Sequence, residues 1–128
     1  MNPFEQQLLS CCLDHQVVGK KENRLEVEAE LLFPASFIGF KGHFPTRPIL
    51  PAIIQLAMIR LLTEQTLTHR LFPNHYGKTK FRRIIEPEQK IMAELKLTLT
   101  EETVDCQFQL KQPDGQVISE GSCIFVYL

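Results

Sequence analysis

The 128-residue sequence predicts an α+β fold, in which an antiparallel sheet of five to six strands wraps around one long buried helix. Residues 52–62 are apolar except for Gln55 and Arg60, which is typical of a helix buried on nearly all sides. Half-buried strands are indicated by the alternation of apolar and polar side chains. This alternation occurs over residues 24–32, 90–100 and 103–111.

The amino-terminal residues 1–16 are predicted to form a short helix that packs on a single domain spanning residues 1–128. Asn2 suits the N-cap, Pro3 the first helical position, and Glu5 the position from which a side chain reaches back to the cap. The apolar side chains that follow share one helical face. They are Phe4, Leu8, Leu9, Cys12 and Leu13.

Two strands are expected next, over residues 17–20 and 24–32, joined by a tight turn. Residues 33–40 lack such alternation and bring three phenylalanines close in sequence to His43. These rings either pack in the core or line a ligand pocket, and the sequence leaves both interpretations open.

A proline-rich loop leads into the central helix. Three of the residues 45–51 are proline, and because each ring fixes φ and removes an N–H donor, no helix can begin before Pro51. Pro51 suits the first helical position. The helix becomes polar after Leu62, so its far end should reach solvent near Arg70, and Pro73 is expected to end it.

The rest of the chain is expected to complete the sheet. Residues 113–115, Pro-Asp-Gly, form a turn before the last strand. Residues 123–128 are apolar on both faces, which is typical of a strand covered on both sides or lying at a subunit interface, and favours a dimer. The remaining strands are predicted over residues 78–85, 90–100, 103–111 and 117–128.

The charge balance excludes some partners. The 14 basic and 15 acidic residues give a net charge of −1, so no overall field favours nucleic acid or an anionic membrane. No apolar run approaches the ~20 residues that span a bilayer, and no secretory signal is recognisable, so a cytoplasmic protein is expected. The four cysteines are expected to be reduced. No metal is expected, because His15, His69 and His75 lack ligand spacing.

Residues 42–51, Gly-His-Phe-Pro-Thr-Arg-Pro-Ile-Leu-Pro, carry a family resemblance. They resemble the loop of FabA/FabZ-type 3-hydroxyacyl-[acyl-carrier-protein] dehydratases, whose pattern G-H-F-P-G-x-P-x-M-P-G precedes a buried helix. Residues 80–87 are similar to that family's K-F-x-x-x-V-x-P segment, and residues 114–121 to its last hairpin. Residues 48–56 also resemble the P-I-L-P-x-x-x-Q-L sequence of a subgroup from aryl polyene pathways.

This resemblance implies the hotdog fold and a dimer with active sites at the subunit interface. It implies that His43 is the base that takes a proton from C2 of the acyl chain. The backbone N–H of Ala52, at the helix start, would bind the thioester carbonyl. The family's helix acid, which protonates the departing 3-hydroxyl from the other subunit, falls on Ala57 here. The expected acyl pocket comprises Phe37, Phe40, Phe44, Ile53 and Leu56.

The family's substrates imply an acyl carrier protein as partner, with its phosphopantetheine carrying the acyl chain and no further cofactor. Lys78, Lys80, Arg82 and Arg83 concentrate positive charge in six residues and would dock such an acidic protein. The alternative is a solvated basic edge that discourages sheet pairing. Because strand side chains alternate, the first three of these cations should share one face.

Three functions remain open from the sequence. The first is an active dehydratase that uses His43 with water or another residue in place of the acid. The second is a degenerate subunit or acyl-binding partner, since Ala57 cannot donate a proton; a mixed dimer with an acid-bearing homologue would contain one complete site. The third is a hotdog thioesterase. That branch of the fold also uses a carboxylate on the helix, which Ala57 does not provide.

Overall fold

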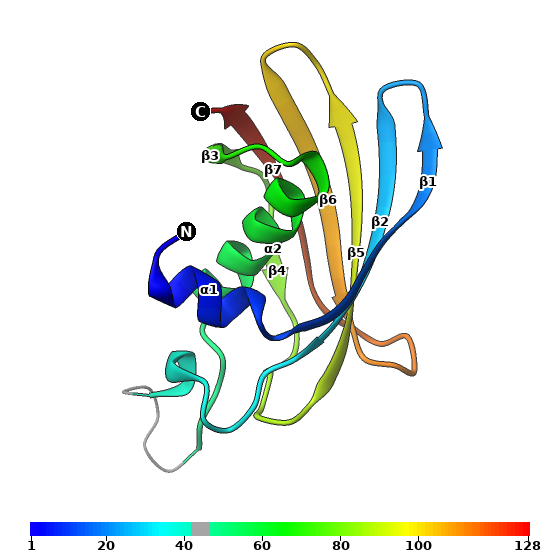
Figure 1. Ribbon diagram of the computed structural model, residues 1–128. Helices are drawn as coiled ribbons and strands as arrows, with labels where there is room; N and C mark the ends of the chain where they lie inside the picture. The colour runs from blue at the N-terminus through cyan, green and yellow to red at the C-terminus, as the bar shows by residue number, and fades with distance from the viewer. Residues whose placement is uncertain (42–46) are drawn as a thin grey trace.

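The computed structural model describes residues 1–41 and 47–128 and consists of one curved sheet around one long helix (Figure 1). The helices are α1 (Pro3–Leu9) and α2 (Ala52–Leu67), with a 3-10 turn at Ile38–Phe40. The strands are β1 (Cys12–Lys21), β2 (Arg24–Leu32), β3 (Leu71–Tyr76), β4 (Lys80–Phe81), β5 (Lys90–Leu99), β6 (Thr103–Lys111) and β7 (Val117–Tyr127).

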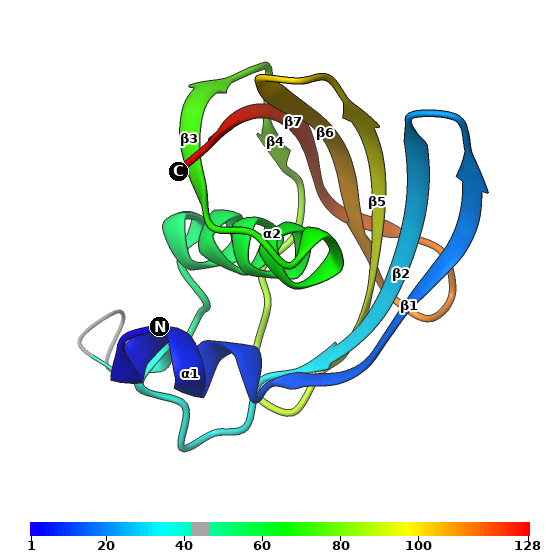
Figure 2. The ribbon, with the colours of Figure 1, turned by 45° about the horizontal axis from the view of Figure 1, so that its top comes forward.

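The sheet has seven strands in the order β1-β2-β5-β6-β7-β3, and β4 also pairs with β7. Every pairing is antiparallel. Helix α2 lies against the concave face, and α1 packs beside it at one end of the molecule (Figure 2). The predicted α+β class is confirmed, with seven strands where five to six were expected.

The amino-terminal helix is shorter than predicted. Its capping box is as expected, because Asn2 accepts from the N–H of Glu5 and the Glu5 side chain bonds back to Asn2. The helix ends at Leu9, and residues 12–16 form the start of β1, because pairing with β2 satisfies their backbone groups better than a marginal helix could. Within β1, His15 faces α2 and bonds the Thr66 hydroxyl at 2.8 Å.

The sequence prediction missed β3. Helix α2 ends at Leu67, where Thr68 adopts a left-handed φ of 52°, so Pro73 is not the residue that ends it. Pro73 lies instead within β3, at the edge of the sheet, where a missing N–H removes no ladder bond. The apolar carboxyl-terminal strand therefore lies inside the sheet between β6 and β3, and does not form its edge.

The predicted strand over residues 78–85 is reduced to the two residues of β4. The N–H groups of Arg82 and Arg83 both bond the carbonyl oxygen of Ile118, at 2.8 and 3.1 Å, so the chain leaves the regular ladder there. It then turns back toward the start of α2, where the carbonyl of Ile85 accepts from the N–H of Leu50 at 2.9 Å.

A buried ion network ties the two helices to β3. Arg60 lies between Glu5 of α1, at 2.6 Å, and Glu64 of α2, at 3.0 Å. The hydrogen bond from Arg60 holds the pKa of Glu5 below its ordinary value, although burial opposes this shift. The stability that this pair adds is complete above the ordinary pKa of a glutamate, and it is lost as the pH falls through the lowered value.

Burial disfavours the reactive thiolate form of three cysteines. Burial raises the pKa of Cys11 to about 11 and that of Cys106 and Cys123 to about 12, so the nucleophilic thiolate is scarce at neutral pH. All four cysteines are free. In the described ranges, no helix is long and apolar enough to cross a membrane.

Candidate functional site

A hollow of about 300 Å³ opens at the amino end of α2. One wall is the extended chain that enters the helix, and the opposite wall is the segment that follows β4. Apolar groups make up most of the lining, and two arginines stand beside them. The lining residues are Ile49, Leu50, Pro51, Ala52, Gln55, Phe81, Arg82, Arg83 and Ile84.

The amino end of α2 is open. Pro51 is the N-cap and not the first helical residue as predicted, and it provides no side-chain cap. The N–H groups of Ile54 and Gln55 bond the carbonyl of Pro51, at 3.1 and 3.3 Å, whereas those of Ala52 and Ile53 find no acceptor among the described residues. The helix therefore presents two backbone donors and the positive end of its dipole beside the hollow.

Gln55 is the polar side chain in the wall of this hollow that the sequence did not assign to the site. It is only 3% exposed, and the hydroxyl of Ser119 in β7 donates to its Oε1 at 2.9 Å. Its amide nitrogen bonds to none of the described residues. The sequence feature that could have identified Gln55 as a site residue is that it is the single polar residue in the first two turns of the helix.

Ala57 lies on a different face of α2. It is partly buried against the core, and it stands ~200° around the helix from Gln55. The only carboxylate of α2 is Glu64, whose oxygen accepts from the N–H of Leu71 at 2.7 Å while its carboxylate pairs with Arg60 and Arg70. Glu64 is thus fully engaged, and α2 has no free acid to replace the one missing at Ala57.

The other residues expected at the site are scattered. His43 and Phe44 lie outside the described residues. Phe37 and Phe40 are buried in a cluster of rings with centroids 6.1 Å apart, whereas Ile53 is 76% exposed at the start of α2. Leu56 packs on the core. Among the described residues predicted for catalysis, carbonyl binding or the acyl pocket, Ala52 lines the hollow.

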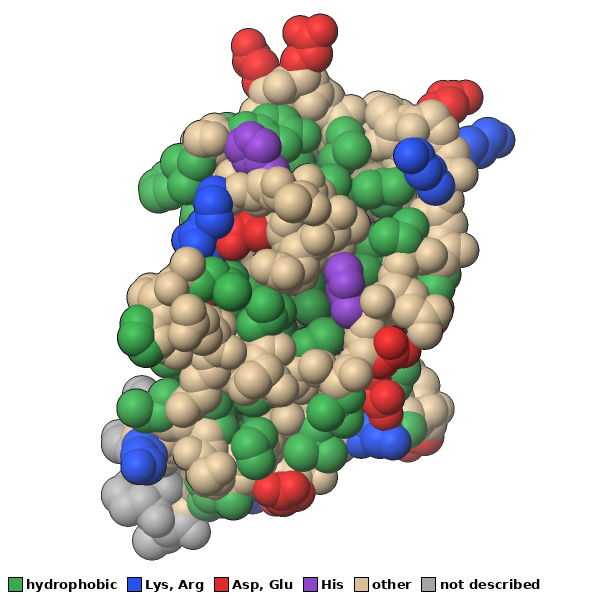
Figure 3. All heavy atoms as spheres, viewed as in Figure 1, with side chains coloured by type: hydrophobic (Ala, Val, Ile, Leu, Met, Phe, Trp, Pro, Cys, Tyr) green, Lys and Arg blue, Asp and Glu red, His purple; other side chains and the backbone are tan. Residues whose placement is uncertain are grey.

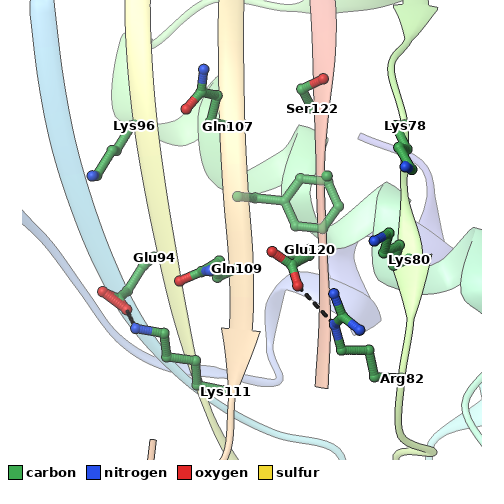
Figure 4. Close-up of a pocket in the computed structure, with 12 residues that line it drawn as sticks. Lys78, Lys80, Arg82, Glu94, Lys96, Gln107, Gln109, Lys111, Glu120 and Ser122 are labelled. Carbon is green, nitrogen blue, oxygen red and sulfur yellow. Dashed lines mark hydrogen bonds and ion pairs between the residues drawn. The ribbon is translucent and has the colours of Figure 1, made fainter. Parts of the chain in front are cut away.

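The predicted docking cations border two hollows, and Arg82 lines both of them. Lys78, Lys80 and Arg82 line a wide hollow of about 590 Å³ on the outer face of the sheet, on the side away from α2 (Figure 4). The sequence missed Lys96 and Lys111, which reach the same hollow from β5 and β6.

Two of these cations are already paired. Arg82 bonds Glu120 at 2.8 Å and so lowers the pKa of that carboxyl, and Lys111 pairs with Glu94. Arg83 does not line the outer-face hollow and borders the hollow at α2. Among the described residues, Lys78, Lys80 and Lys96 form no ion pair, and no three potential ligands gather to hold a metal ion.

Comparison with known proteins identifies the family. A model of the ApeI-like family, described as ApeI dehydratase, matches residues 18–122, which include the hollow, α2 and most of the sheet. The chain belongs to the ApeI-like dehydratase family. The matched region leaves out α1 and includes the segments over residues 42–51 and 80–87 that carry the resemblance to dehydratases.

Two curated relatives of this ApeI-like protein are 3-hydroxyacyl-[acyl-carrier-protein] dehydratases named FabZ. The one from Rickettsia typhi is 39% identical over 56 residues, covering 38% of this chain and 39% of that protein. The one from Anaeromyxobacter dehalogenans is 26% identical over 92 residues, covering 64% of this chain and 59% of that protein. The matches therefore span roughly two fifths to three fifths of these relatives.

Solved structures confirm the hotdog fold. An uncharacterised protein from Erwinia carotovora matches with a TM-score of 0.76 at 20% identity, over 91% of this chain and 95% of that one. The dehydratase heterocomplex ApeI:P from Xenorhabdus doucetiae matches with a TM-score of 0.66 at 19% identity, over 90% of this chain and 96% of that one. A hypothetical thioesterase protein with coenzyme A from Streptococcus pneumoniae matches with a TM-score of 0.63 at 6% identity, over 98% of this chain and 94% of that one.

Proposed function

We propose that this ApeI-like protein binds acyl thioesters carried on a carrier protein and removes water from 3-hydroxyacyl chains, with His43 as the base. The observation that carries the proposal is the open amino end of α2. The N–H groups of Ala52 and Ile53 there bond to no described residue, and Ala52 lines a hollow whose residues follow the Gly-His-Phe-Pro loop in sequence. Two such donors can stabilise the negative charge that grows on a thioester carbonyl.

The reaction balances as an elimination. The imidazole of His43 takes a proton from C2, and the electron pair of that C–H bond forms the C2–C3 double bond through an enolate held by the Ala52 N–H. The C3–O bond breaks, and the hydroxide leaves as water after gaining one proton. Because α2 has an alanine at position 57 and a fully paired Glu64, that proton comes from solvent or from another subunit.

His43→Ala is expected to lower the interconversion of 3-hydroxyacyl- and 2-enoyl-carrier protein at least ~100-fold, which is the usual contribution of a general base. The rate would be followed by the enoyl thioester absorbance. His75→Ala is the matched control, because His75 is exposed in β3, away from the hollow. Equal rates for the wild type and His43→Ala would exclude this dehydratase mechanism.

A second candidate function follows from Ala57: a subunit that completes its site with the acid of a related chain. Its support is the exposure of large apolar side chains on several elements, and the helix side of the molecule carries apolar groups at its surface (Figure 3). Co-expression with an acid-bearing homologue should give mixed oligomers in native mass spectrometry; only separate homo-oligomers would contradict it. The exposed side chains at the start of α2, on β3, and on β4 and the segment after it are Ile53, Phe72, Tyr76, Phe81 and Ile84.

The carrier protein is proposed to dock on the outer-face hollow, where Lys78, Lys80 and Lys96 form no ion pair with a described residue. The double variant Lys78→Glu with Lys80→Glu is expected to raise KM for carrier-bound substrate about tenfold and to leave KM for pantetheine-bound substrate unchanged. Lys20→Glu with Lys21→Glu, at the opposite edge of the sheet, is the control of equal charge. A KM unchanged for both substrates would place docking elsewhere.

A further inference from the structure

Gln55 is a buried amide in the wall of the α2 hollow, and neither the packing of the core nor the proposed elimination requires it. One end of its carboxamide is fixed, because Ser119, itself fully buried, donates to the amide oxygen at 2.9 Å. The nitrogen has no hydrogen-bond partner among the described residues, while the residue lines the hollow. A side-chain amide that lines a hollow can donate a hydrogen bond to a polar atom of a ligand bound there.

The position of Gln55 relative to Ala52 indicates which ligand atom it meets. Residues three apart lie on the same face of a helix, and Gln55 stands ~4.5 Å further along the axis than Ala52. In the proposed function, the N–H of Ala52 holds the thioester carbonyl, which is C1 of the acyl chain. The oxygen on C3 lies two carbons beyond it, so it falls within reach of a side chain one turn deeper.

We propose that Gln55 recognises the oxygen substituent on C3 of the acyl chain, so that the hollow selects 3-hydroxyacyl groups over saturated ones. This inference rests on the proposed acyl-thioester function. The side chains of Ile49, Leu50 and Ile84 in the surrounding wall are apolar and offer that oxygen no donor. Arg82 and Arg83 also line the hollow. A polar group held in an apolar wall discriminates strongly against a ligand that leaves it unpaired.

A carboxamide can hold a hydroxyl without protonating it. Its N–H donates a hydrogen bond but is not acidic at physiological pH. Gln55 therefore positions the 3-hydroxyl and does not replace the acid absent at Ala57. Ser119 acts one step removed, by fixing the rotamer of the Gln55 side chain. Gln55 is thus assigned the recognition of the 3-hydroxyl, and the proton that this hydroxyl gains comes from outside α2.

The test compares two pantetheine analogues in which an amide replaces the thioester, so that no elimination occurs: the 3-hydroxybutyryl and the butyryl compound. Isothermal calorimetry should show that the wild type binds the 3-hydroxybutyryl analogue about tenfold more tightly. Gln55→Met, which has similar volume and no N–H, should bind both analogues as the wild type binds the butyryl one. Gln65→Met, exposed on the same helix, should keep the wild-type preference.

The outcomes separate this inference from the function on which it rests. Equal binding of both analogues by the wild type, or an undiminished preference in Gln55→Met, overturns the role of Gln55 and leaves the acyl site standing. Failure of the wild type to bind either analogue overturns both. If Gln55→Met does not fold, Ser119→Ala supplies the test: its preference should fall severalfold, and an unchanged preference would contradict the inference.

Discussion

Ala57→Glu is expected to raise the rate of 3-hydroxyacyl dehydration by at least ~100-fold, because a positioned general acid contributes 10²–10⁴. The substitution restores a carboxylic acid at the position that bears it in FabA/FabZ-type dehydratases. Ala57 is partly buried, and Ile53, four residues earlier on the same helical face, is 76% exposed. A longer side chain at position 57 thus has a path toward the surface where a second subunit would lie.

The decisive comparison is with Ala57→Gln, which has the same size and can bond the 3-hydroxyl but cannot protonate it. Only Ala57→Glu should gain activity, and adding His43→Ala to it should abolish the gain. The initial rate of enoyl formation measures both effects. If the glutamate and glutamine variants react equally slowly while remaining folded, the missing acid is not what limits this chain.

Local patterns predicted the elements that depend on local chemistry. The prolines before residue 52 fixed where α2 begins to within one residue, because ring geometry acts on the backbone directly. The alternation in β2, β5 and β6 was equally informative, since each strand has one face on the core and the other in solvent. The proline positions and the alternation within each strand can each be seen in one continuous stretch of sequence, without knowing what packs beside it.

The pattern failed where tertiary pairing overrode it. Pro73 ordinarily breaks regular structure, yet at a sheet edge its missing N–H removes no bond, so β3 passes through it. Residues 12–16 fit a helical face, yet β2 offered them a full ladder of backbone bonds. Neither outcome could be derived without knowing which strand lies alongside.

The site was only half predictable for the same reason. The helix start was visible because loop and helix are consecutive in sequence. The Gln55–Ser119 bond joins residues 64 positions apart, and no local pattern announces such a contact. Lys96 and Lys111 were missed as members of the outer-face hollow because they come from two further strands, although the shared face of Lys78, Lys80 and Arg82 followed from alternation.

Glu64→Ala is expected to lower the free energy of unfolding by about 3 kcal/mol, because it removes one partner from a buried charge network. Glu64 is buried, and it pairs with Arg60 and Arg70 and accepts the N–H of Leu71. Arg60 retains Glu5, and half-exposed Arg70 can turn to water, so the loss should lie at the low end of the range for buried pairs. Urea denaturation at neutral pH measures it.

Two further variants assign the loss to its cause. Glu86→Ala breaks an ion pair with Arg47 in which both side chains are more than half exposed, so it should cost less than about 1 kcal/mol. Glu64→Gln keeps an acceptor for the N–H of Leu71 but removes the charge, so its stability should fall between the two. Similar urea denaturation midpoints for Glu64→Ala and Glu86→Ala would contradict this prediction. They would show that the apolar core, and not this ion network, holds α1, α2 and β3 together.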